Sequence, residues 1–307
     1  MGLKENPYVY VSETMLDLKE LPKRLAIIGA GYIGIEFASI YRHFGSQVTV
    51  LQDGDAFLPR EDAEVAAAVR AQLEKQGIVI RTGVKVLETA TKDGYAEVVI
   101  EAENKEERLP ADAVLVATGR KPATSLLNLE AAGIKTDARG GIITDEYRMT
   151  STEGVYAIGD VAGGRQFTYL SLDDYRIVAS KLLGDGGYSL NERGQIPYST
   201  FIEPPFSRVG MTEEEAKKAG YQVKVGRLAA SAIPKSMILS QADGLLKAVV
   251  DAQSGQILGA HLFCEESHEM INLIKMAMDA KLPYTVIRDM IFTHPSMSES
   301  LNTLFSI

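Results

Sequence analysis

The chain has 307 residues, of which 46% are hydrophobic and 24% charged, and its formal net charge is −9. This composition is typical of a folded globular protein, and the length predicts two or three domains. The acidic balance argues against nucleic acid or an anionic membrane as a partner, and no apolar run reaches the length of a membrane span. With one cysteine, Cys264, and no signal-peptide core, the sequence predicts a cytoplasmic protein without a disulfide framework.

The first third of the chain alternates short apolar runs with segments of helical periodicity. The expected strands are 24–28, 46–51 and 78–81, and the expected helices are 32–43 and 61–76. This β-α-β-α-β order with short loops predicts an α/β fold with a Rossmann-type, doubly wound parallel sheet. Residues 84–109 alternate in polarity and predict a small antiparallel meander, which a buried strand at 113–117 follows.

The remaining sequence indicates two further parts. Short strands are expected within 140–158 and a helix over 168–183, before a glycine-rich linker at 184–194. From residue 196 onward the pattern predicts an α+β domain. Its expected strands are 197–202, 208–211, 222–228, 245–251 and 256–263, and its expected helices are 212–219, 269–281 and a last one after 298. Thr212 and Glu215 have the spacing of a capping box at the start of the first of these helices.

A glycine-rich turn directly follows the first predicted strand. Gly29 permits the tight turn, Gly31 lets the backbone approach a pyrophosphate, and Gly34 allows close packing of helix and strand. The helix that begins at Tyr32 and Ile33 directs free N–H groups and the positive end of its dipole to the phosphates. Because the turn joins a predicted strand to a predicted helix, nucleotide binding is favoured over a turn used only for packing.

The end of the second strand predicts which nucleotide binds. An acidic residue at this position normally binds the adenine-ribose 2′-hydroxyl, and here the position is Gln52, followed by Asp53 and Asp55. A neutral amide can hydrogen-bond the hydroxyl, and the nearest arginine, Arg60, lies eight residues further on. NAD is therefore the first expectation, and NADP stays open.

An acid–base pair is expected near the C-terminus. His294 has a side chain suited to proton transfer near neutral pH, and Glu299 would orient the imidazole ring. Five residues separate the two, but Pro295 interrupts any helix and allows a compact return, for which we predict a cis His294–Pro295 bond. The alternative is a histidine whose hydrogen bonds are satisfied at an interface.

A second group of soft ligands comprises Cys264, His268 and Met270. Cys264 ends an apolar strand and Met270 begins an apolar helical stripe. Packing is therefore favoured over metal binding, and no metal site is predicted.

Several motifs in a fixed order resemble the pyridine nucleotide–disulfide oxidoreductase family, and within it the mercuric-reductase and dihydrolipoamide-dehydrogenase branch, above all the reactive-chlorine-resistance reductases. The motifs are GAGYIGIEFA (29–38), LPRED (58–62), VATGRKP (116–122), TEGVYAIGD (152–160), FTYLSLDD (167–174), SHEM (267–270) and FTHPSMSESL (292–301). The resemblance implies an NAD(P)-binding Rossmann domain at 1–116, a C-terminal piece of an FAD-binding domain at 117–190 and a dimerisation domain at 191–307. It also implies that hydride passes from a nicotinamide nucleotide through FAD to a disulfide.

The resemblance assigns roles to individual residues. Asp160 would bind the FAD ribityl chain, and the helix N-terminus at Thr168 would face the flavin ring. Gly119 would form the turn between domains. Glu36 matches a family glutamate that pairs with a lysine beside the flavin, and because that lysine would lie in the part of the family's sequence that is absent here, the pair is not expected to form within this chain. His294 and Glu299 would serve the disulfide of a partner subunit, which implies a homodimer.

The family also has an earlier FAD-binding glycine motif and a cysteine pair, and neither is in this sequence. The sequence therefore predicts a fragment of a flavoprotein oxidoreductase, in which FAD binding is in doubt. Two alternatives stay open: a non-catalytic NAD-binding and dimerisation module, and complementation by a separate FAD-binding polypeptide.

Overall fold

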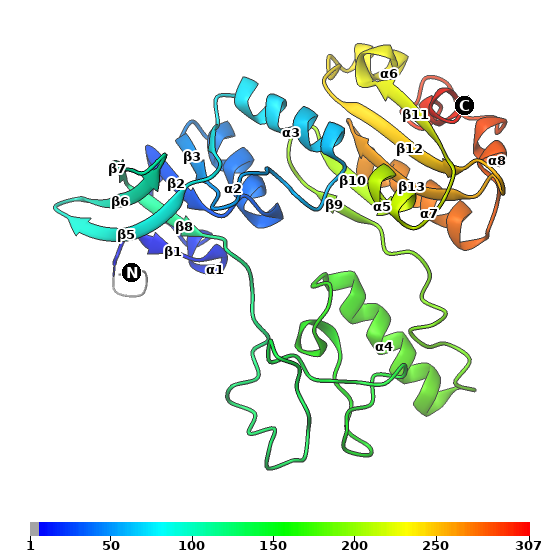
Figure 1. Cartoon of the computed structure of the whole chain (residues 1–307), viewed down its shortest axis with the longest axis horizontal. Coiled ribbons are helices and arrows are strands. Elements are labelled where there is room, and N and C mark those ends of the chain that lie inside the picture. The colour runs from blue at the N-terminus through cyan, green and yellow to red at the C-terminus, as the bar shows by residue number, and fades with distance from the viewer. Residues whose placement is uncertain (1–5) are drawn as a thin grey trace. The chain divides into compact units, whose positions relative to one another are not determined.

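The computed structural model describes residues 6–307, which form two compact units (Figure 1). One unit contains residues 6–118 together with 195–307, and the other contains residues 119–194. Each helix among residues 6–307 is too short or too polar to span a membrane.

A five-stranded parallel sheet forms the centre of the first part of the chain. Its strands, in spatial order, are β1 (Val9–Tyr10), β8 (Ala113–Val116), β2 (Arg24–Ile28), β3 (Gln47–Leu51) and β4 (Val79–Arg81). The predicted parallel sheet is confirmed. Each of its four predicted strands begins and ends within one residue of the observed strand. Strand β1 was not predicted, because two residues are too few to show a period of two.

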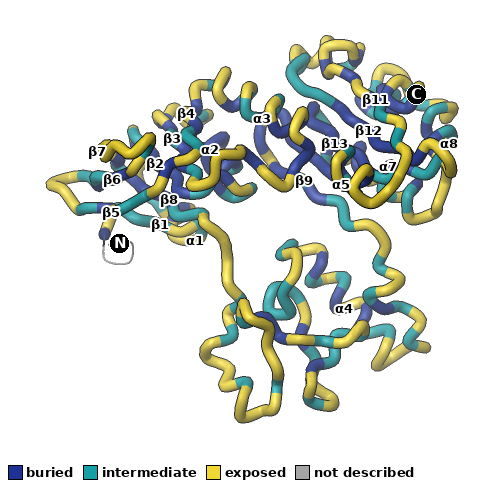
Figure 2. The backbone as a smooth tube through the Cα atoms, viewed as in Figure 1, coloured by how far each residue is buried: buried dark blue, intermediate teal, exposed yellow. Residues whose placement is uncertain are grey.

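The two faces of strand β2 bury different parts of the chain. Leu25 and Ile27 pack in the same cluster as helices α2 (Tyr32–His43) and α3 (Ala63–Lys75). Ala26 and Ile28 instead pack against the predicted meander, and their alternation follows from the two-residue period of a strand. That meander is a three-stranded antiparallel sheet of β5 (Lys85–Lys92), β6 (Tyr95–Ala102) and β7 (Lys105–Ala111). The central strands β2 and β8 are therefore buried on both faces, and Figure 2 shows them largely in the colour of buried residues.

The C-terminal part has the predicted α+β composition. Its antiparallel sheet, in spatial order, consists of β11 (Val223–Ala229), β12 (Leu245–Asp251), β13 (Ile257–Phe263), β10 (Phe206–Gly210) and β9 (Tyr198–Thr200). The helices of this part are α5 (Glu213–Lys218), α6 (Pro234–Ile238), α7 (Ser267–Asp279), α8 (Tyr284–Arg288) and α9 (Ser300–Leu304). The predicted capping box is present, since Thr212 and Glu215 exchange side-chain and backbone hydrogen bonds at the start of α5.

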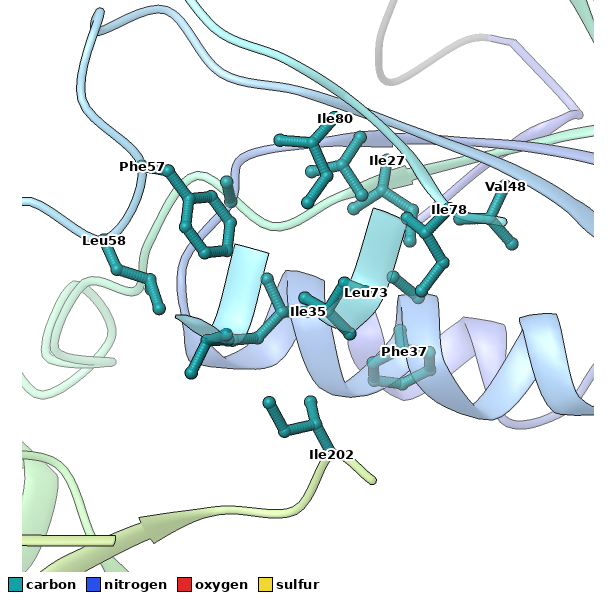
Figure 3. Close-up of a cluster of buried hydrophobic side chains, with 14 of the residues drawn as sticks. Ile27, Ile35, Phe37, Val48, Phe57, Leu58, Leu73, Ile78, Ile80 and Ile202 are labelled. Carbon is teal, nitrogen blue, oxygen red and sulfur yellow. The ribbon is translucent and has the colours of Figure 1, made fainter. Parts of the chain in front are cut away.

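The N-terminal and C-terminal parts of this unit share one hydrophobic core. Ile202, Phe206 and Phe263 belong to the same buried cluster as Ile35 and Phe37 of α2, and Figure 3 shows Ile202 among these side chains. Each such side chain, once fully buried, contributes about 1.5–3 kcal/mol. The two parts therefore pack as one unit, while their assignment as separate domains, with boundaries at 116 and 190, stays a prediction.

The second unit contains one long helix and much irregular chain. Helix α4 (Thr168–Leu183) has the predicted bounds, and a short 3-10 turn, η1 (Gly159–Ala162), precedes it. The strands predicted within 140–158 are wrong: this stretch forms only isolated bridges, such as Thr144 with Thr150 and Met149 with Tyr156. A bridge of one residue pair makes no ladder, so the β-branched residues there do not assemble into a sheet.

Candidate functional site

Two of the three glycines in the predicted turn have positions that exclude any side chain. A Cβ at Gly34 would lie 2.0 Å from the carbonyl oxygen of Gly29, where helix α2 crosses the end of β2. A Cβ at Gly29, whose φ is +108°, would lie 2.6 Å from the carbonyl oxygen of Ala117. Both glycines are thus required for the close packing of helix and strands.

Gly31 differs, because its surroundings are open. Among the described residues, no atom lies within 4 Å of the position that its Cβ would take. Gly31 caps helix α2 with extended backbone, at φ −75° and ψ 178°, and no side chain caps this helix. The first N–H groups of α2, from Tyr32 and Ile33 onward, therefore border an open space at the positive end of the helix dipole.

Gln52 holds this turn in place. Its side-chain Oε1 accepts a hydrogen bond of 3.0 Å from the backbone N–H of Ala30, within the turn. The sequence predicted only a contact between Gln52 and a ribose, because the neighbour of its amide oxygen depends on how the second strand lies beside the first. Its amide nitrogen keeps two donors that suit a ribose hydroxyl.

Tyr32 connects the turn to the C-terminal part through a buried carboxylate. Its hydroxyl donates to Glu61 Oε1 at 2.5 Å, and the hydroxyl of Tyr198 donates to the same oxygen at 2.7 Å. Arg208 lies 3.4 Å from the other carboxylate oxygen. Burial, followed by the charge of Glu61, raises the pKa of Tyr32 to about 12. The sequence did not predict this network, since its members come from separate elements.

Glu36 also lies where α2 meets the C-terminal part. Its Oε1 accepts a hydrogen bond of 2.8 Å from the backbone N–H of Phe201. Burial raises the pKa of Glu36, and this hydrogen bond partly opposes the shift. The role that the resemblance gives to Glu36, with its lysine partner outside this sequence, stays a prediction.

The predicted acid–base pair is assembled. His294 Nδ1 lies 2.8 Å from Glu299 Oε2, and the other carboxylate oxygen accepts from the N–H of Ser296 at 2.9 Å. The hydrogen bond from His294 is the largest of the effects that lower the pKa of Glu299. The His294 side chain is 69% exposed. The His294–Pro295 bond is cis, as predicted.

The three soft-ligand residues differ in burial, and the His268 side chain is 36% exposed. Cys264 and Met270 are fully buried in the core of the C-terminal part, which agrees with the packing interpretation. Burial raises the pKa of the Cys264 thiol well above its ordinary value. This thiol is therefore unsuited to act as a nucleophile.

In the second unit, the residues predicted to face the flavin lie near the start of α4. Asp160 lies in η1 and its side chain is 42% exposed, and a terminal guanidinium nitrogen of Arg120 lies 3.5 Å from its carboxylate. Thr168 is the exposed first residue of α4, and no side chain caps that helix. Gly119, at φ +122°, begins the unit and takes a conformation that favours glycine.

These features define a Rossmann-type dinucleotide fold joined to an α+β domain that carries an acid–base pair. Residues 4–174 match the family model described as "Pyridine nucleotide-disulphide oxidoreductase", and residues 196–305 match the dimerisation domain of the same family. The chain therefore belongs to the pyridine nucleotide-disulphide oxidoreductase family. Members of this family are flavoproteins that use FAD and a nicotinamide nucleotide.

Relatives with known names cover nearly the whole chain. A protein of Escherichia coli, "Probable pyridine nucleotide-disulfide oxidoreductase RclA", is 48% identical over 306 residues, which cover 100% of this chain and 68% of that protein. The mercuric reductase of Staphylococcus aureus is 36% identical over 98% of this chain and 54% of its own length. The structure titled "Cu(II) complex of HOCl-induced flavoprotein disulfide reductase RclA from Escherichia coli" superposes with a TM-score of 0.96 at 48% identity, and covers 100% of this chain and 70% of that one.

Proposed function

We propose that this chain is the nucleotide-binding and dimerisation portion of an FAD-dependent oxidoreductase, which takes hydride from NAD(P)H and delivers electrons to a disulfide or a metal ion. The open space at Gly31, at the uncapped start of α2, carries this proposal. A pyrophosphate in that space would accept hydrogen bonds from the first N–H groups of the helix. The proposal includes a metal ion because the related E. coli structure is a Cu(II) complex.

The surroundings of Gln52 favour NADH over NADPH. The nearby Arg81, at the end of β4, donates from both terminal nitrogens to Glu107, at 2.7 and 2.9 Å. That guanidinium is already neutralised and is poorly placed to bind a 2′-phosphate. Asp53 and Asp55 add negative charge next to Gln52, which disfavours a phosphate further.

The second unit fits one edge of a flavin. Asp160 presents an exposed carboxylate that can accept hydrogen bonds from ribityl hydroxyls, and the uncapped start of α4 favours negative charge. When bound, the flavin supplies the hydride chemistry, and the protein orients it. In this protein, Asp160 and the start of α4 would hold the ribityl group and the electron-rich edge of the flavin ring beside the N-terminus of that helix.

The His294–Glu299 pair supplies proton transfer. With Nδ1 held by Glu299, the tautomer that leaves Nε2 unprotonated is favoured, and this atom can take a proton from a thiol. The sole cysteine of this chain, Cys264, is buried, so the thiols must belong to another polypeptide segment or a substrate. We infer that the pair acts across a homodimer built by the domain at 196–305.

A second candidate is a nucleotide-binding, dimeric module without flavin. The observation that favours it is the buried single cysteine, which excludes a dithiol couple within this sequence. Both candidates predict nucleotide binding, and only the first predicts a bound flavin.

Calorimetric titration of the purified chain with NADH, and separately with NADPH, tests the nucleotide binding that both candidate functions predict. We expect saturable one-site binding with at least ~10-fold preference for NADH, equivalent to about 1.4 kcal/mol. Light scattering on the same sample should give the mass of a dimer. Absence of binding by either nucleotide would refute the nucleotide site, and a monomer mass would refute the homodimer.

A further inference from the structure

Helix α4 carries a carboxylate that is almost completely buried. The Asp174 side chain is 1% exposed, and its Oδ1 accepts from Arg148 Nε at 2.9 Å and from a terminal nitrogen of Arg193. Its other oxygen, Oδ2, accepts from the backbone N–H of Gly159 at 2.8 Å. No residue of this set was predicted as a site residue from the sequence.

A buried carboxylate is costly to the fold unless it is paired and hydrogen-bonded. The positive charges of Arg148 and Arg193 compensate the negative charge of Asp174. Both arginines bind Oδ1, so Oδ2 remains available to the N–H of Gly159. The neighbouring Asp173 is used differently: it accepts from Tyr188 at 2.8 Å and from Arg193 at 2.6 Å. Two adjacent acids thus share one arginine, and only Asp174 contacts the turn.

The contact with Gly159 determines the position of Asp160. Gly159 has φ +70°, and a Cβ there would lie 2.6 Å from Ser171 Oγ, so the turn packs directly on α4. Asp160 follows at once, with its carboxylate half exposed. The carboxylate of Asp160 is therefore held at a defined place relative to Thr168, the first residue of α4. The hydrogen bond from the Gly159 N–H to Asp174 links the turn to this helix.

We propose that Asp174 is a positioning residue for the flavin site, because it fixes the Gly159–Asp160 turn relative to the N-terminus of α4. The inference rests on the proposed function, in which Asp160 and the start of α4 contact FAD. Asp174 itself touches no ligand in this scheme. Its charge and geometry hold the two contacts at a constant spacing, which a ligand that spans both requires.

The matched variants are Asp174→Asn and Asp173→Asn in the full chain. Because both arginines bind Oδ1 of Asp174, the asparagine would turn its amide nitrogen toward the Gly159 N–H, donor against donor. Asp173→Asn removes one negative charge from the preceding residue and leaves the hydrogen bond from the Gly159 N–H to Asp174 in place. We expect FAD affinity, measured by quenching of flavin fluorescence, to fall about 10-fold or more in Asp174→Asn and less than about 2-fold in Asp173→Asn.

Hydrogen exchange of the Gly159 amide provides a readout that does not depend on flavin. It should become faster in Asp174→Asn and stay unchanged in Asp173→Asn. If Asp174→Asn unfolds the second unit, the double variant Arg148→Gln/Asp174→Asn removes the opposing charges together and should fold, still with weakened FAD binding.

The outcomes separate the inference from the proposed function. If the wild-type chain binds FAD and the folded Asp174 variants bind it equally well, the inference is refuted and the proposed function stands. If the wild-type chain takes up no FAD, the flavin part of the proposed function fails, and the positioning role fails with it.

Discussion

Substitution of Gly31 by valine should separate nucleotide binding from folding. The extended backbone of Gly31 is open to any residue, and a Cβ there would have no described atom within 4 Å apart from those of the adjacent residues. The free energy of unfolding should therefore change by less than about 1 kcal/mol, since a Gly replacement mainly affects the unfolded chain. Valine would instead fill the space next to the first N–H groups of α2. Loss of two hydrogen bonds to a charged phosphate, at about 1.5–3 kcal/mol each, predicts ~10²–10⁴-fold weaker NADH binding.

Gly34→Ala provides the contrasting control. Its Cβ would lie 2.0 Å from the carbonyl oxygen of Gly29, so helix and strand must separate. Overpacking of this kind costs about 1–3 kcal/mol, which lowers Tm by several degrees in a chain of this size. Calorimetry of NADH binding and thermal melts of both variants test the reasoning. Unchanged NADH affinity in Gly31→Val, or an unchanged Tm in Gly34→Ala, would refute it.

Two further predictions concern stability. Lys247→Met removes the buried ammonium group that pairs with the carboxylates of Asp62, Glu64 and Glu213. It should lower the free energy of unfolding, measured by urea titration, by about 3–5 kcal/mol. Lys218→Met removes an exposed ion pair and should change the same free energy by less than about 1 kcal/mol. Burial, and then the charge of Arg208, lowers the pKa of His261 to about 4. As the pH falls, His261 therefore binds a proton in the unfolded chain at a higher pH than in the folded chain. The free energy of unfolding should accordingly fall by about 2–3 kcal/mol between pH 6.5 and pH 4. His261→Gln should flatten this part of the pH profile, and an equally steep slope in that variant would contradict the assignment.

Local sequence signals predicted most of the elements. Helix α4 and strand β12 have the expected bounds, and the capping box at Thr212 marks the start of α5. The glycine turn was predicted because its spacing is local, and the structure adds that Gly31 alone of the three borders open space. Periodicity and capping depend on neighbours within a few residues, which the sequence displays directly.

Contacts between distant segments were not predictable in this way. Asp174 lies in a helical pattern that gives no sign of Arg148, Arg193 or the Gly159 amide as its partners. The strands expected within 140–158 failed for the same reason, because a strand needs a pairing partner that local propensity does not supply.

The visible absorption spectrum of the purified chain, recorded after incubation with FAD, desalting and anaerobic addition of NADH, tests the central claim most directly. The account predicts a retained flavin band near ~450 nm that NADH bleaches. Absence of the band in a chain that still binds NADH would contradict a flavin-dependent oxidoreductase and would favour the nucleotide-binding module without flavin.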